Sequence, residues 1–464
     1  MKLNGSRSES ADASSFLGDL IETLTERGRA LLGRRSDQGA IPQLDLIAMS
    51  ELLLSRSGEA SGVALAQTLL ASYSAAPDAD RLAFLQALAD RFGPDRRRIE
   101  LAIEAVRRDE GTEALEGLHA AAEPRRQELI RRLNLAPGGT SALVRMREEL
   151  LAYLPTHPEL KCVDADFIHL FSSWFNRGFL VLRPIDWTTP ANILEKIIRY
   201  EAVHAIQNWD DLRNRLQPDD RRCYGFFHPQ LVDEPLIFVE VALTKEISGA
   251  IGPLLDLSRT PIAAIEATTA VFYSISNTQK GLGGVSFGNF LIKQVVENLK
   301  RELPNLKTFV TLSPVPVFAR WLEHEREAEE SGVLGSSAKE ILSILDEPGW
   351  STDPDQAEKV REVLLSAAAY YFLKAKDPRG RPVDPVARFH LGNGARLERL
   401  NVLGDVSAKG LKQSHGLMVN YLYALDEIEK NHEAFAEKGV IAASPTVRKA
   451  LRADLRSRDL MPTS

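Results

Sequence analysis

The chain has 464 residues, 44% of them hydrophobic, and a formal net charge of −7. This length and composition indicate a globular protein of two or three domains with a sizeable core. The negative charge argues against nucleic acid or acidic lipid as a general partner. Two cysteines, Cys162 and Cys223, are too few for a disulfide framework, so we expect reduced thiols and a cytoplasmic protein.

Membrane and metal signals are missing from the sequence. No apolar run reaches the roughly 18 residues of a membrane-spanning helix, and the polar start lacks the apolar core of a signal peptide. We therefore expect no membrane association. No pair of histidines has the short spacing of zinc ligands, so no metal is expected.

Residues 1–155 are rich in Ala, Leu, Arg and Glu, and their apolar positions recur at helical spacing. Leu85 and Leu88 belong to one such buried face, and Gly93-Pro94 ends that helix. We find no catalytic constellation in this part. The pattern predicts an all-helical N-terminal domain over residues 1–155 that serves as a scaffold and joins copies of the chain into a homo-oligomer.

Residues 156–464 contain both strand-like and helix-like segments, a pattern that predicts an α/β catalytic domain. The whole chain is therefore predicted to be of the α+β class. Strands are predicted at 178–182, 224–227, 236–243, 268–276 and 308–312. Helices are predicted at 190–216, 286–303 and 357–374, and Ala387–Leu391 lies in the C-terminal tail. Ser444-Pro445 is a typical N-cap and first-turn pair that begins a last helix.

A glycine-rich turn over residues 279–285 joins a predicted strand to the following helix. Glycines let backbone N–H groups approach a ligand closely, and a helix N-terminus adds unpaired N–H groups that suit a pyrophosphate. The turn matches neither the dinucleotide fingerprint nor the P-loop. The order strand, turn, helix, strand resembles the coenzyme A site of the GNAT acyltransferase superfamily, although Leu282 stands where its motif has glycine. The alternative is a connection that only tightens the fold.

Short segments that occur in order along the second half of the chain resemble malonyl-CoA decarboxylases. They are Tyr200–His204, Arg221–Tyr224, His228-Pro229, Glu234–Leu236, Phe272–Ser276, Gly281–Asn289, Leu312–Pro316, Phe389–Leu391, Asn393–Ala395, Gly416–Met418 and Asn420-Tyr421. The resemblance implies a helical N-terminal domain joined to a GNAT-like catalytic domain. It also implies a carboxy-lyase that converts malonyl-CoA to acetyl-CoA and CO2. No separate cofactor is implied, because coenzyme A is part of the substrate.

The resemblance also implies site residues. Ser313 in the Leu-Ser-Pro motif and His390 in the Phe-His-Leu motif would be catalytic. Tyr423 lies in the C-terminal motif and would support the site. The coenzyme A loop would comprise Gly283, Gly284, Val285, Ser286, Phe287, Gly288 and Asn289. Some relatives look to carry an acidic residue where this chain has Ser286.

These residue types suit the chemistry. Loss of CO2 leaves an enolate whose charge gathers on the thioester oxygen, and one donor placed there is typically worth about 3 kcal/mol of barrier. Ser313 could be that donor, or could bind the malonyl carboxylate, without being a covalent nucleophile. His390 suits protonation of the carbon, because imidazole exchanges protons near neutral pH. The plain alternatives are a turn serine before proline and a core histidine.

Other residues have plainer interpretations. His204 is placed on the predicted helix 190–216, where it would pack, and His228 before proline fits a turn. His415 has no assigned role. Arg448, Lys449 and Arg452 on the last helix could bind coenzyme A phosphates, although a solvated helix face explains them as well.

Two other functions fit the same sequence. A GNAT-type acyltransferase would use the same turn, move the acyl group to an amine and release free coenzyme A. A non-catalytic acyl-CoA sensor would bind malonyl-CoA and leave it intact, with the helical part binding a partner. The products of a malonyl-CoA incubation separate these hypotheses.

Overall fold

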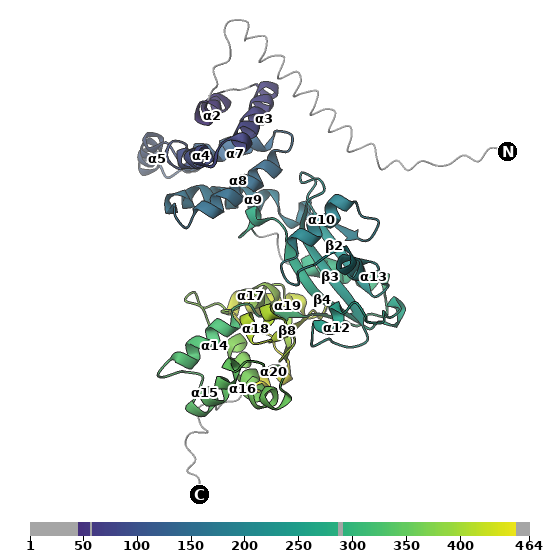
Figure 1. Ribbon diagram of the computed structural model, residues 1–464. Helices are drawn as coiled ribbons and strands as arrows, with labels where there is room; N and C mark the ends of the chain where they lie inside the picture. The colour runs from purple at the N-terminus through teal and green to yellow at the C-terminus, as the bar shows by residue number, and fades with distance from the viewer. Residues whose placement is uncertain (1–44, 56–57, 286–290, 452–464) are drawn as a thin grey trace, which may run out of the picture. The chain divides into compact units, whose positions relative to one another are not determined.

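A computed structural model describes residues 45–55, 58–285 and 291–451. These residues form two compact units, each described by itself below (Figure 1). The helical unit contains the described residues up to Phe179 together with the segments 228–232 and 279–285. The sheet unit contains the remaining described residues up to 451.

The helical unit confirms the predicted all-helical fold. Its helices are α2 (Leu46–Ser55), α3 (Glu59–Ala75), α4 (Asp78–Asp90), α5 (Arg96–Arg108), α6 (Thr112–Ala122), α7 (Arg125–Asn134), α8 (Gly139–Tyr153) and α9 (Lys161–Trp174). Helix α9 lies beyond residue 155, where we placed the domain boundary. It buries Val163, Phe167 and Phe171 at helical spacing. The change in composition near residue 155 is therefore a change in side-chain type within one helical unit.

The glycine-rich turn packs against α8 within the helical unit. Arg147 on α8 is buried, and its guanidinium donates to the carbonyl of Gly281 at 2.7 Å and to Asp164 at 2.8 Å. A Cβ atom at Gly281 would lie 1.9 Å from the carbonyl oxygen of Val144. Glycine is therefore required at position 281 by the close approach of two backbones.

The sheet unit is built on one mixed eight-stranded sheet (Figure 1). Its strands are β1 (Val181–Ile185), β2 (Arg221–Phe227), β3 (Pro235–Thr244), β4 (Thr269–Asn277), β5 (Thr308–Thr311), β6 (Ser313–Pro314), β7 (Arg396–Asn401) and β8 (Met418–Leu422). Strands β1 to β4 are antiparallel neighbours, whereas β4 and β5 are parallel and are connected through α13 (Leu291–Glu302). This confirms the predicted order of strand, turn, helix and strand.

Strands β4 and β5 separate before β4 ends. Their last ladder pair is Phe272 with Thr311, and one further bond runs from the Leu312 N–H to the Phe272 carbonyl. Strand β4 then continues to Asn277, whereas the chain after β5 forms β6 and pairs with β8. We call the opening between the end of β4 and β6 the sheet split. At this point β4 stops pairing with β5, and the chain after β5 turns to β8 instead.

Ten helices, each within the described residues, accompany this sheet besides α13. They are α10 (Ala191–Tyr200), α11 (Trp209–Leu216), α12 (Gly252–Leu255), α14 (Phe318–Glu327), α15 (Ser336–Leu342), α16 (Pro354–Leu373), α17 (Pro385–Gly392), α18 (Ala408–Ser414), α19 (Ile428–Lys438) and α20 (Pro445–Ala450). Ser444 caps α20 by accepting the Val447 N–H, as predicted. Among the described residues, no helix has both the length and the apolar character needed to cross a membrane.

The single helix predicted at 190–216 is wrong, because α10 and α11 are separated by a loop over residues 201–208. The Glu201 carboxylate accepts the N–H groups of Val203 and His204 at 2.8 and 2.7 Å, and Asn208 caps α11. Side chains that bind nearby backbone N–H groups compete with the helix. His204 accordingly lies in the loop and not on a helix.

Candidate active site

Ser313 and His390 come from distant parts of the chain and meet in the sheet unit. Ser313 is in β6, which is positioned by pairing with Val419 of β8, and His390 is in the last turn of α17. Both side chains are buried, with exposed fractions of 5% and 3%. The Oγ of Ser313 lies 3.1 Å from Nε2 of His390, which is hydrogen-bonding distance.

Two further hydroxyl groups extend this contact into a chain of hydrogen bonds. Ser313 donates to Oγ1 of Thr311 at 2.9 Å, and the Tyr423 hydroxyl lies 2.8 Å from Nδ1 of His390. A serine has a single proton to donate. Because Ser313 uses its proton in the hydrogen bond to Thr311, it can only accept from His390. His390 therefore donates from Nε2 to Ser313 and accepts at Nδ1 from Tyr423. The arrangement thus selects one neutral tautomer of the ring.

The environment of His390 is aromatic and buried. Tyr421 stacks on the imidazole with ring centroids 4.5 Å apart and an interplanar angle of 25°. Burial lowers the pKa of His390 to about 3, because the charged imidazolium loses its hydration there. In the absence of a negatively charged ligand the ring is therefore neutral at physiological pH.

Side chains from other parts of the sheet unit and a capping aspartate hold both ends of helix α17. Asp384 caps its N-terminus by accepting the Ala387 N–H at 2.8 Å, and the buried Tyr371 of α16 donates to the other oxygen at 3.3 Å. Burial raises the pKa of Asp384 to about 6. At the other end, the His432 ring lies 2.7 Å from the Gly392 carbonyl. These contacts fix the backbone that carries His390.

The predicted coenzyme A loop is only partly described. Gly283, Gly284 and Val285 belong to the helical unit, whereas Ser286, Phe287, Gly288 and Asn289 lie outside the described residues. Gly284 has a φ of 78°, a left-handed conformation that favours glycine, and Val285 is buried. The described part of the turn thus has conformational and packing reasons for its sequence, and its role in binding stays a prediction.

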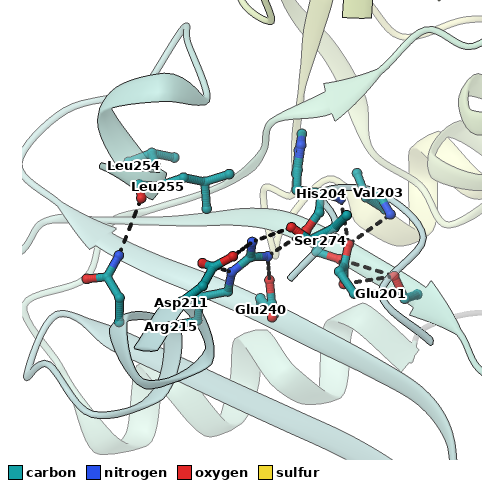
Figure 2. A network of polar contacts seen from close by, with 12 residues as sticks. Glu201, Val203, His204, Asp211, Arg215, Glu240, Leu254, Leu255 and Ser274 are labelled. Atoms are coloured by element: carbon teal, nitrogen blue, oxygen red, sulfur yellow. Dashed lines mark hydrogen bonds and ion pairs between the residues drawn. The ribbon is translucent and has the colours of Figure 1, made fainter. Parts of the chain in front are cut away.

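A buried polar network occupies the loop between α10 and α11 (Figure 2). Glu201 accepts hydrogen bonds from the hydroxyls of Ser274 and Ser276 on β4. Arg215 of α11 binds Asp211 at 3.1 Å and Glu240 of β3 at 3.2 Å, as Figure 2 shows. Burial, with the nearby Glu201 carboxylate, raises the pKa of Glu240 to about 8.

Three other predicted residues have structural contacts. His228 packs on Phe175 with ring centroids 4.8 Å apart. His415 ends α18 in a left-handed conformation with a φ of 50°. Arg448 donates to the carbonyl of Ile441 at 3.1 Å, and Arg452 lies outside the described residues. His228 and Arg448 thus stabilise local structure.

The described residues form an α+β fold with a mixed sheet and a buried Ser–His pair. A profile of the malonyl-CoA decarboxylase C-terminal domain matches residues 178–461, and a profile of the N-terminal domain matches residues 92–175. The chain belongs to the malonyl-CoA decarboxylase family.

Individual relatives agree with this assignment. The structure of malonyl-CoA decarboxylase from Rhodopseudomonas palustris is 69% identical, covers 87% of this chain and 98% of its own, and superposes with a TM-score of 0.85. The Agrobacterium vitis structure is 59% identical, covers 88% and 100%, and has the same TM-score of 0.85. The mitochondrial malonyl-CoA decarboxylase of Anser anser anser is 35% identical over 79% of each chain.

Sequence reasoning missed Thr311, Tyr421 and the Glu201 network. Thr311 precedes Ser313 by two residues, the spacing that puts two strand side chains on one face, so it could have been found. Tyr421 lies in a motif we noted, but its stacking on His390 depends on how β8 pairs. Glu201 was hidden inside the predicted helix.

Proposed function

We propose that this protein decarboxylates malonyl-CoA to acetyl-CoA and CO2 at Ser313 and His390. The proposal rests above all on the 3.1 Å contact between the Ser313 hydroxyl and the His390 imidazole. The two residues were assigned from separate motifs, yet they form one buried pair. Thr311 binds the serine and Tyr423 binds the histidine. Membership of the family, whose relatives carry this activity in their names, supports the same reaction.

The first step breaks the bond between the malonyl carboxylate and its neighbouring carbon. The electron pair of that bond moves into the thioester, which becomes an enolate, and CO2 leaves. Ser313 supports this step if its proton turns from Thr311 to the thioester oxygen as charge develops there. We propose that no separate cofactor and no metal take part, because the thioester itself accepts the electrons.

The second step returns a proton to the carbon. The malonyl carboxylate is a negative charge, and such a charge near an imidazole favours its protonated form. We propose that His390, neutral in the free protein, takes up a proton as substrate binds and delivers it from Nε2 to the enolate carbon. Tyr423 at Nδ1 keeps the ring oriented while the proton moves.

The sheet split offers a binding mode for the pantetheine arm of coenzyme A. Strand β4 continues through Ser274 and Ser276 beyond its last pair with β5. Strand edges can bind extended ligands through backbone hydrogen bonds, and pantetheine carries two amides. We propose that the acyl-thioester arm lies along this edge, which is adjacent to Ser313.

Incubation with malonyl-CoA and no acceptor tests the function. The proposal predicts equal amounts of CO2 and acetyl-CoA. Free coenzyme A without CO2 would favour the acyltransferase or a thioesterase, and unchanged malonyl-CoA with measurable binding would favour the sensor. The Ser313→Ala/His390→Asn double variant serves as the control for background hydrolysis.

We further propose a cytoplasmic homo-oligomer formed through the helical unit. Helices α5 and α6 form a pair whose groove is lined by small and apolar residues, among them Leu101, Ala105 and Gly117, and by four charged side chains, two arginines and two carboxylates. Leu101 and Leu115 are about half exposed, at 56% and 52%. Light scattering of the wild-type chain and of Leu101→Glu tests whether this surface joins two copies.

A further inference from the structure

We infer that Glu201 is a positioning residue for the reaction, because it ties both sides of the sheet split to one loop and so sets the opening that receives the acyl-thioester arm. The inference rests on the proposed function. Glu201 touches no reacting atom in this account; it acts through β4 on one side and α18 on the other.

The first side of the split depends on a β-bulge in β4. Val241 of β3 pairs with Phe272, but Glu240 pairs with Ser274, so Tyr273 is the extra residue. Neighbouring residues of β3 point to opposite faces, and therefore Phe272 and Ser274 do so as well. Without the bulge, Ser274 would share the face of Phe272.

That face is the one occupied by Ser313. Phe272 pairs with Thr311 in the parallel ladder, and the Thr311 and Ser313 hydroxyls bind each other on one side of the strand. The bulge therefore turns Ser274, and Ser276 after it, to the face opposite Ser313. Ser274 and Ser313 each follow the last ladder pair by two residues, so the split opens between them.

Glu201 binds the two redirected serines. Its Oε2 accepts from Ser274 at 2.7 Å and from Ser276 at 3.1 Å, while Oε1 accepts the N–H groups of Val203 and His204 (Figure 2). Glu201 is 8% exposed and both serines are 1% exposed. Hydrogen bonds to a carboxylate are stronger than neutral ones, so the end of β4 is held firmly to the loop over residues 201–208.

The same loop is bound from the second side of the split. Lys409 of α18 donates to the carbonyls of Ala202 and Val203 at 2.6 and 2.9 Å. Helix α18 leads into β8, whose Val419 pairs with Ser313. One loop therefore connects the free end of β4 to the elements that place Ser313.

This arrangement predicts an effect on substrate binding that differs from loss of a catalytic group. Glu201→Ala removes all four hydrogen bonds and should raise the KM for malonyl-CoA by about tenfold or more while kcat stays within about threefold. Glu201→Gln should restore much of the affinity, because its amide oxygen still accepts two N–H groups and its NH2 can donate to the serine oxygens.

Ser276→Ala removes a single hydroxyl and leaves Glu201 and its loop in place, so it should also raise the KM for malonyl-CoA. If Glu201→Ala does not fold, the KM of Ser276→Ala tests the inference in its place. Glu302→Gln is the matched control. Like Glu201, Glu302 accepts a hydrogen bond from a hydroxyl group of the sheet, in its case that of Tyr224 on β2. Its KM should match the wild type.

The outcomes separate the two proposals. Folded Glu201→Ala and Ser276→Ala with wild-type KM would overturn the inference while leaving the function intact, and so would a loss confined to kcat. If the wild type itself releases no CO2 from malonyl-CoA, the proposed function fails first and this inference fails with it. Thermal unfolding of each variant shows whether a change in KM comes from folded protein.

Discussion

Nε2 of His390 and Oγ of Ser313 lie 3.1 Å apart, although 77 positions separate the two residues in the chain. Pairing of β6 with β8 places the serine, and the capped helix α17 places the histidine. Each nitrogen of the ring faces a hydroxyl, Ser313 on one side and Tyr423 on the other. The pair therefore has a defined tautomer before any substrate arrives.

Replacement of the histidine tests its role as the proton donor. His390→Asn should lower kcat by about 10²- to 10⁴-fold, the usual contribution of a general acid. Binding of coenzyme A, measured by calorimetry, should remain close to that of the wild type. Wild-type turnover in this variant would remove His390 from the mechanism.

The serine should contribute through developing charge. We expect Ser313→Ala to raise the barrier by about 2–4 kcal/mol, seen in kcat, since it removes a donor that acts on the transition state. Ser343→Ala is the control, because Ser343 is exposed and its hydroxyl donates to the backbone carbonyl of Glu340. A covalent acyl-enzyme detected by mass spectrometry would contradict the assignment as a hydrogen-bond donor.

Acid should destabilise the protein through His390. Burial lowers its folded pKa to about 3, below the unfolded value of about 6.5. The folded state therefore binds this proton less readily, and stability present above pH 6.5 is lost as the pH falls towards 3. One such group changes the free energy of unfolding by up to about 1.4 kcal/mol per pH unit.

Denaturant titrations between pH 6.5 and 4.5 measure this effect. The slope of unfolding free energy against pH should be shallower in His390→Asn than in the wild type. Equal slopes would mean that His390 is not buried in its neutral form. His204 and His415, whose pKa values burial lowers to about 4, remain in both proteins and cancel in the comparison.

Two glycines of the turn should respond differently to alanine. A Cβ atom at Gly281 would lie 1.9 Å from the Val144 carbonyl, so Gly281→Ala should cost at least about 1–3 kcal/mol of stability. At Gly283 the nearest atom is the Lys280 carbonyl oxygen at 3.2 Å, and the cost should be smaller. Thermal unfolding checks the order. A larger loss in Gly283→Ala than in Gly281→Ala would contradict the packing of the turn on α8.

Much of the sheet could be predicted because its signals are local. Neighbouring residues are enough to identify the apolar runs of β3, β4 and β5, and the same holds for the Ser444 cap. Strand β7 (Arg396–Asn401) was missed because arginine and glutamate interrupt its apolar positions. The break after Tyr200 was missed because it depends on one carboxylate, that of Glu201, binding its own loop.

In the candidate site too, some features could be predicted from local sequence and others could not. Ser313 and His390 came from motifs, but their contact depends on the β6–β8 register and could not follow from spacing. The stacking of Tyr421 on His390 and the turning of Ser274 by the Tyr273 bulge depend equally on strand pairing. Such relationships join elements far apart in the sequence, so no local pattern contains them.

The most direct test of the account follows the proton in heavy water. Wild-type protein incubated with malonyl-CoA in D2O should release one CO2 for each acetyl-CoA, and mass spectrometry should find one deuterium in each acetyl group. His390→Asn should form this product far more slowly. Free coenzyme A with malonate retained, or deuterated acetyl-CoA formed at the wild-type rate without His390, would contradict protonation of a thioester enolate by this histidine.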